Sequence, residues 1–305
     1  MSFLAEYGLF ILKAISLGAV VLFVFGGILA LSRKPKAHIE IESFDATFKT
    51  RKKQIEKAKK SKKDLPSRFV LHFKGDISAT EVEQLRDEVS MILSTATPKD
   101  EVVVCVESPG GSVSGYGLAA SQLARIRHKK IPLTVCIDVV AASGGYLMAC
   151  VANQILAAPF AIIGSIGVVA QMPNFHRLLK RNNIDIELLT AGKYKRTLTM
   201  LGENTKKDRE KFQEDLEAIH DLFKNHVTAY RKKLNLEQVA TGEHWLGEDA
   251  LNLKLVDKIK TSDDYLFEGL EKYNTVLLST PVKKPMMQKV FKPLSSLLRY
   301  ERHHL

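Results

Sequence analysis

Cysteine is scarce in this 305-residue sequence, which has only three. Cys105, Cys136 and Cys150 all lie in apolar stretches, so we interpret them as small core residues and not as a disulfide framework. No spacing of histidine, cysteine or carboxylate residues is typical of a metal site, and internal repeats are also missing. We therefore expect neither a metal nor a cofactor.

Acidic residues are outnumbered by basic ones, and the formal net charge is +11 at pH 7. Much of the excess lies in a lysine-rich segment that is poor in large apolar side chains and includes the lysine run of residues 57–63. This run has no interleaved aromatic residues and belongs to no recognisable nucleic-acid-binding module, so we expect no nucleic-acid partner. We interpret residues 33–67 as a solvated linker near a membrane surface, where lysine is attracted to anionic lipid.

Residues 9–31 form the longest apolar run near the N-terminus, and no residue from Ala14 to Leu31 is charged. That length matches the hydrocarbon core of a bilayer. A cleaved signal peptide is the alternative, but a basic segment (residues 33–36) follows instead of a small-x-small cleavage site. We predict that residues 1–32 are a retained single-pass transmembrane helix in contact with lipid. The basic flank would place the rest of the chain in the cytoplasm.

From Arg68 onward, short apolar runs alternate with helix-like segments. We expect strands at 69–73, 102–106, near 133 and at 184–190, and a long helix from about Thr205 with an inner side that includes Phe223 and Val227. This alternation predicts an α/β fold in which helices cover a parallel sheet. The predicted domain spans residues 68–262, and residues 263–305 form a C-terminal extension with a basic tail.

One stretch, residues 131–149, predicts a strand, a tight turn at Ser143 and a buried helix. A serine at a helix N-terminus lies where backbone N–H groups favour negative charge, and Gly144 and Gly145 leave room for a substrate backbone. This is a plausible position for a nucleophile. The simpler interpretation is that Ser143 only caps the helix.

A second crossing from strand to helix follows Val106 and contains Ser108-Pro109-Gly110-Gly111. If the two crossings are adjacent in a parallel sheet, one would hold the serine and the other would donate hydrogen bonds to an oxyanion. Two ordinary glycine turns are the alternative.

A serine nucleophile needs a base, and the sequence offers two kinds. The nearest downstream histidine is His176, but no histidine lies in a strand-end loop beside an obvious carboxylate, which argues against a Ser-His-Asp triad. A lysine can serve instead if burial leaves it uncharged. Lys193 and Lys195 follow a predicted strand at a glycine turn, where active-site loops are common.

Four motifs in order resemble the signal peptide peptidase family of bacterial membrane-bound serine peptidases. They are Ser108-Pro109-Gly110-Gly111, Ala142-Ser143-Gly144-Gly145-Tyr146, Gly164-Ser165-Ile166-Gly167-Val168 and Gly192-Lys193-Tyr194-Lys195. The resemblance covers roughly residues 65–260, and it implies a fold like that of the Clp protease and the crotonases.

The resemblance also implies a role for each matching residue. Ser143 corresponds to the nucleophile and Lys195 to the general base, with Lys193 as the fallback. Ser165 corresponds to the serine that orients the lysine, and the N–H groups of Gly111 and Gly144 correspond to the oxyanion hole. Two residues depart from the family pattern: Glu107 before the first motif and Arg196 after the last.

The activity that the resemblance implies is a Ser-Lys endopeptidase that cleaves peptides or membrane-derived protein fragments, such as signal peptide remnants. It further implies a homo-oligomer at the bacterial inner membrane, with the catalytic domain in the periplasm, in conflict with the basic flank. Two alternatives are a crotonase-like acyl-CoA-binding enzyme and a non-catalytic membrane scaffold. The acyl-CoA-binding enzyme would need neither Lys195 nor a membrane anchor, and in the scaffold Ser143 would be structural.

Overall fold

A computed structural model of the chain describes residues 65–278, residues 52–57 and scattered positions between residues 8 and 18. The chain divides into two units, Met1–Thr47 and Phe48–Leu305, and the fold described here belongs to the second. Most of the predicted anchor and linker, and the basic tail, lie outside the described residues. Among the residues that are described, no helix is both long and apolar enough to cross a bilayer.

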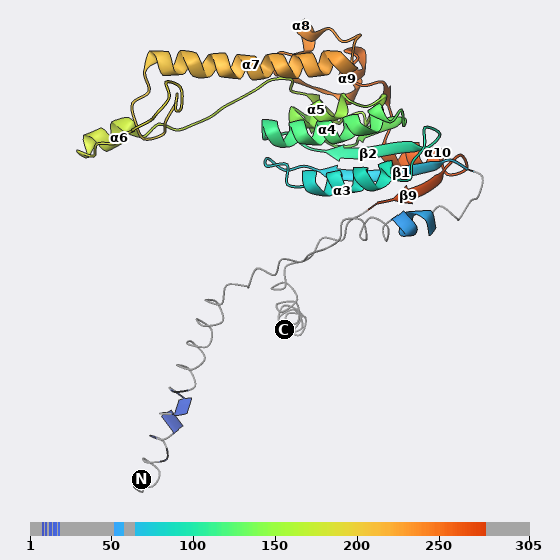
Figure 1. Cartoon of the computed structure of the whole chain (residues 1–305), viewed down its shortest axis with the longest axis horizontal. Helices are drawn as coiled ribbons and strands as arrows, with labels where there is room; N and C mark the ends of the chain where they lie inside the picture. Colours follow the sequence, from blue (N-terminus) through green and yellow to red (C-terminus); the bar gives the residue numbers. More distant parts are fainter. Residues whose placement is uncertain are drawn as a thin grey trace, which may run out of the picture. The chain divides into compact units, whose positions relative to one another are not determined.

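Strands and helices alternate through the second unit, as the sequence predicts (Figure 1). In chain order they are β1 (Ser67–Lys74), α3 (Val82–Leu93), β2 (Glu101–Glu107), α4 (Val113–His128), β3 (Leu133–Ile137), β4 (Val140–Ala142), α5 (Gly144–Ala149), β5 (Gln154–Ala157), β6 (Ile162–Gly164), α6 (His176–Arg181), α7 (Lys206–Tyr230), α8 (Leu236–Val239), β7 (His244–Leu246), α9 (Gly247–Asn252), β8 (Lys258–Ile259), α10 (Ser262–Glu268) and β9 (Asn274–Leu277).

Six strands form one parallel sheet in the order β8-β5-β3-β2-β1-β9. The prediction of an α/β fold with a parallel sheet is therefore confirmed. Because the strands are parallel, their carboxyl ends meet at one edge, which is where α/β proteins bind ligands. The glycine crossing follows β2 of this sheet, whereas the serine crossing follows β4, which belongs to a smaller sheet.

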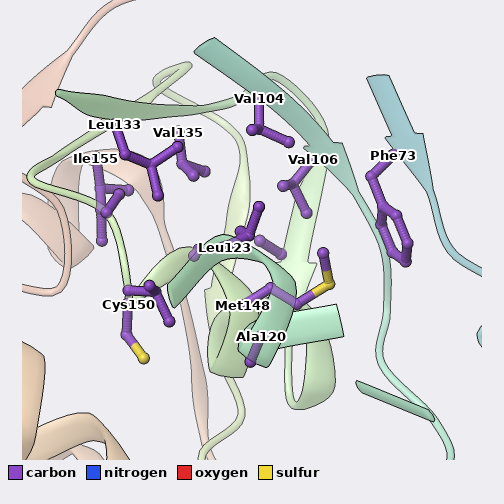
Figure 2. Close-up of a cluster of buried hydrophobic side chains, with 14 of the residues drawn as sticks. Phe73, Val104, Val106, Ala120, Leu123, Leu133, Val135, Met148, Cys150 and Ile155 are labelled. Atoms are coloured by element: carbon purple, nitrogen blue, oxygen red, sulfur yellow. The ribbon is translucent and has the colours of Figure 1, made fainter. Parts of the chain in front are cut away.

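The two faces of the sheet are covered unequally. Side chains at alternate positions of the strands, among them Val104, Val106 and Val135, pack in the main core against Leu123 of α4 and Met148 of α5 (Figure 2). The opposite face carries a smaller cluster that α10 covers with Tyr265 and Leu266. Near-continuous apolar strands are what burial on both faces requires.

A smaller sheet, β4-β6-β7, carries the chain from the main sheet to the serine turn. β4 pairs in parallel with β6, so that Ala142 lies opposite Gly164, and β6 pairs antiparallel with β7. The ring of Trp245 on β7 packs against Gly164, which has a φ of +104°. This small sheet fixes the backbone on both sides of the predicted nucleophile.

Residues 169–205, which we call the arm, differ from the prediction. The expected strand at 184–190 is wrong, because this segment has no paired strand and every residue from 181 to 196 is exposed. Its alternating apolar side chains, Ile184, Ile186 and Leu188, are between 42% and 52% accessible. The arm closes on itself instead, with the Phe175 amide bonded to the Met200 carbonyl at 2.7 Å, and Figure 1 shows its helix α6 beyond the first turns of α7.

Candidate active site

Ser143 occupies the turn between β4 and α5 in a backbone conformation that favours glycine. Its φ is 51° and its ψ is −117°, which makes the turn strained. The Ser143 amide donates to the Gly164 carbonyl at 2.8 Å, and the Leu147 amide donates to the Ser143 carbonyl at 2.9 Å. Ser143 makes no side-chain cap hydrogen bond to α5. The structure therefore removes the simpler interpretation of Ser143 as a helix cap.

The second glycine crossing lies directly against this turn, as expected for one shared site. Gly110 has a φ of +88°, and a Cβ on it would lie 2.6 Å from the Gly144 amide nitrogen and 2.7 Å from the Ser143 Cβ. Only a residue without a side chain permits both the conformation and the approach. The two crossings are therefore joined in space, although they are separated in sequence by α4 and β3.

Two backbone amides at this junction have no acceptor among the described residues. The Gly110 amide donates to Ser108 Oγ at 3.1 Å, and the Ser112 amide donates to the Ile77 carbonyl at 2.8 Å. The Gly111 amide lies between these two in sequence, and the Gly144 amide lies across the junction. Neither donates a hydrogen bond to an acceptor in the described part of the chain. Free N–H groups beside a serine hydroxyl can stabilise an oxyanion.

Ser165 follows β6 and also has a positive φ, of 51°. Its amide donates to the Glu243 carbonyl at 2.6 Å. Ser165 and Ser143 line the same cavity, together with Gly111 and Gly144. The structure thus gathers four of the five site residues implied by the resemblance around one cavity.

This cavity has a volume of about 1200 Å³ and lies between the two crossings, α4, α5 and α7. Its wall is mainly apolar, with Leu147 from α5, Val168 from the loop after β6 and Phe223 from α7. Gly117 and Ala120 on α4 add little side-chain bulk. A cavity of this kind suits an extended peptide with apolar side chains.

The two candidate lysines are not part of the cavity lining within one copy of the chain. Lys193 and Lys195 both lie on the arm and are exposed. The Lys193 Nζ lies 5.0 Å from the centre of the Tyr194 ring, and the Lys195 amide donates to the Gly192 carbonyl at 3.1 Å. The structure therefore places the predicted base away from the predicted nucleophile in the same copy.

Two histidines on α7 line the cavity, and the sequence analysis did not predict them as site residues. His220 Nε2 lies 3.2 Å from the Ile166 carbonyl, and His226 Nε2 lies 3.1 Å from the Leu147 carbonyl. Burial lowers the pKa of His226, against the smaller opposing effect of that hydrogen bond. Their helical spacing from Phe223, on the predicted inner side of α7, was the signal that could have found them.

The two departures from the family pattern lie outside the cavity lining. Glu107 forms an ion pair with Lys74 at 2.8 Å, and this pairing raises the pKa of Lys74. Arg196 is exposed on the arm.

Two family models match the sequence: Peptidase family S49 N-terminal over residues 42–123, and Peptidase family S49 over residues 125–274. A protein described as "Probable protease SohB" from Buchnera aphidicola subsp. Schlechtendalia chinensis is 48% identical over 302 residues, which cover 87% of this chain and 99% of that protein. The chain belongs to peptidase family S49. The family expectation drawn from the four motifs is thereby confirmed.

Other S49 relatives support the same class of enzyme. "Probable protease SohB" from Haemophilus influenzae is 54% identical over 221 residues, which cover 72% of this chain and 63% of that protein. "Serine protease SPPA, chloroplastic" from Arabidopsis thaliana is 28% identical over 72% of this chain and 32% of that protein. This S49 chain is a SohB-like serine peptidase, so the acyl-CoA-binding and scaffold alternatives are set aside.

Proposed function

We propose that this S49 peptidase is a membrane-anchored endopeptidase in which Ser143 is the nucleophile and Lys195 is the general base. The observation that carries the proposal is the junction of the two crossings. There, a serine on a strained turn faces an apolar cavity beside two amides that lack an acceptor among the described residues.

The chemistry follows from these groups. An uncharged Lys195 takes the proton from the Ser143 hydroxyl as its Oγ attacks the carbonyl carbon of a peptide bond. The resulting oxyanion accepts hydrogen bonds from the Gly111 and Gly144 amides. As the C–N bond breaks, the lysine returns the proton to the departing amine. Water then hydrolyses the acyl-enzyme, with the lysine again accepting a proton.

The lysine in this scheme comes from the arm of a neighbouring copy. The arm exposes large apolar side chains, with Val169 88% and Leu189 90% accessible. Apolar exposure of this extent is typical of a protein–protein contact. A homo-oligomer would cover the arm and bring its lysine to the Ser143 cavity of the next copy, where Ser165 would orient it. Lys193 is the second choice for the base.

The proposed substrates are peptides or membrane-derived protein fragments, such as signal peptide remnants. The apolar cavity wall supports small or aliphatic side chains near the cleaved bond. Residues 9–31 would anchor the enzyme in the bacterial inner membrane, close to such fragments. Cell fractionation, with protease protection in intact and permeabilised spheroplasts, would test the anchor and determine which side the domain occupies.

Labelling with a serine-reactive fluorophosphonate tests the catalytic assignment. The full chain in detergent is compared with Ser143→Ala, Lys195→Ala and Lys193→Ala from about pH 6 to about pH 10. We expect labelling to require Ser143 and Lys195 and to rise toward alkaline pH, because a lysine must lose its proton to act as a base.

Other outcomes would reassign the base or remove the proposal. Labelling that depends on Lys193 moves the role to that residue. A profile that levels off by about pH 8 and is lost in His220→Gln or His226→Gln indicates a histidine base. Labelling that persists in Ser143→Ala contradicts the nucleophile itself.

A further inference from the structure

Tyr116 on α4 is fully buried behind the two crossings. Its hydroxyl lies 2.7 Å from the Asp76 carbonyl and 2.5 Å from Ser108 Oγ. Its ring packs edge-on to Phe73, with 6.2 Å between the ring centres. The hydroxyl is thus held at a defined place beneath the loop that carries Gly110.

The direction of these hydrogen bonds follows from the groups present. A carbonyl can only accept, so the single phenol proton of Tyr116 goes to Asp76. Ser108 must then donate its proton to the Tyr116 oxygen. The Ser108 oxygen in turn accepts from the Gly110 amide at 3.1 Å. The result is a one-way chain from Gly110 through Ser108 and Tyr116 to Asp76, in which each bond strengthens the next.

The same two residues also contact the nucleophile turn and the strand before it. A Cβ on Gly144 would lie 2.4 Å from Cγ of the Tyr116 ring, so the ring supports Gly144 directly. The Ser108 backbone donates to Val140 at 2.8 Å and accepts from Ala142 at 3.0 Å. Ser108 and Tyr116 therefore touch both crossings at once.

We propose that Ser108 and Tyr116 are positioning residues that aim the Gly111 and Gly144 amides at the oxyanion. The inference rests on the proposed function, because it supposes that these amides stabilise the tetrahedral intermediate. The hydrogen bond to Ser108 Oγ holds the Gly110 amide, and Gly110 is followed directly by Gly111, which lines the cavity. Burial raises the pKa of Tyr116, which favours the protonated hydroxyl that donates to Asp76.

Removal of single hydroxyl groups tests this role. Tyr116→Phe keeps the ring beneath Gly144 but removes the hydroxyl that bonds to Ser108 and Asp76. Ser108→Ala removes the hydroxyl that bonds to the Gly110 amide and to Tyr116. Tyr265→Phe is the matched control, because its hydroxyl also makes two hydrogen bonds, to Glu101 at 2.5 Å and to Thr134 at 3.3 Å, beside the cluster on the opposite face of the sheet.

We expect each site variant to lower kcat about 10-fold and leave KM within about twofold, because the oxyanion forms only after substrate has bound. The rate constant of phosphonate labelling should fall by about the same factor, since the phosphoryl oxygen occupies the same position. The double variant should lose no more than either single one, because one break already interrupts the chain. Tyr265→Phe should keep the wild-type kcat at a temperature where it stays folded.

Two results would overturn the inference while the proposed function stands. One is an unchanged kcat in folded Tyr116→Phe and Ser108→Ala. The other is an equal loss in Tyr265→Phe, which would indicate general destabilisation. If the wild type itself shows no activity or labelling that depends on Ser143, the proposed function fails and this inference fails with it.

Discussion

The Ser143 amide donates a hydrogen bond of 2.8 Å to the Gly164 carbonyl. This bond continues the ladder between β4 and β6, in which Ala142 lies opposite Gly164. The backbone of Ser143 is therefore held by the small sheet through its amide and by α5 through its carbonyl, which accepts from the Leu147 amide at 2.9 Å.

Replacement of Ser143 should separate stability from activity. Ser143→Gly and Ser143→Ala both remove the hydroxyl, but only glycine adopts a φ of 51° and a ψ of −117° without strain. We expect Ser143→Gly to have a free energy of unfolding about 1–2 kcal/mol higher than that of Ser143→Ala, with no peptidase activity in either. Urea unfolding and a peptide cleavage assay measure both. Equal stability of the two variants would show that the turn is not strained.

Gly110→Ala should damage both the fold and the site. Its φ is +88°, and the new Cβ would lie 2.6 Å from the Gly144 nitrogen, so the two crossings must separate. We expect a loss of about 2 kcal/mol or more in the free energy of unfolding. Gly117→Ala is the comparison for stability, because it lies inside α4 with nothing within 4 Å of its Cβ. That substitution should raise the free energy of unfolding by about 0.5–1 kcal/mol. Equal free energies of unfolding for the two variants would contradict the steric conflict between a Cβ at position 110 and the Gly144 nitrogen.

Mixed oligomers should reveal whether the lysine comes from a neighbouring copy. Ser143→Ala and Lys195→Ala are each expected to be inactive. When equal amounts are dissociated and reassembled together, about a quarter of the sites should combine an intact serine with an intact lysine from the next copy. Peptidase activity should therefore return to about a quarter of the wild-type value. A mixture that stays inactive, although mass spectrometry shows mixed oligomers, would place both residues in one copy.

His226 should make the folded state sensitive to acid. Burial lowers its pKa in the folded chain, so the unfolded chain binds more protons below the ordinary histidine pKa of about 6.5. Stability is then fully present above that pH and falls as the pH drops toward the lowered value. His226→Gln keeps a donor for the Leu147 carbonyl and cannot ionise, so its free energy of unfolding should decline less between about pH 7.5 and about pH 5.5. Parallel declines in the two proteins would contradict this.

The central strands β1, β2 and β3 could be predicted because they are short apolar runs separated by segments of clear helical period. The inner side of α7 is another such case, since Phe223 and Val227 are buried at the predicted spacing. The turn at Ser143 was predictable from its small neighbours. Local sequence carries these features because each depends on one segment packing against a sheet.

The arm could not be predicted, because its apolar alternation at Ile184, Ile186 and Leu188 is the pattern of a half-buried strand. In the structure these side chains are exposed, and no strand pairs with them in the described chain. The alternating pattern alone does not determine whether an apolar side chain packs in the core of its own domain. For the same reason the motif around Lys195 gave a residue but not its position relative to Ser143.

The pairing of β1 with β9 has a consequence for how the domain is made. Ser67 lies opposite Asn274, and the Leu278 amide donates to the Val70 carbonyl at 3.0 Å. While β9 is still inside the ribosome during synthesis, β1 has no partner strand on that side, and the edge of the sheet is open. Open edges recruit strands from other molecules, so nascent or truncated chains that end before β9 expose an edge that favours aggregation.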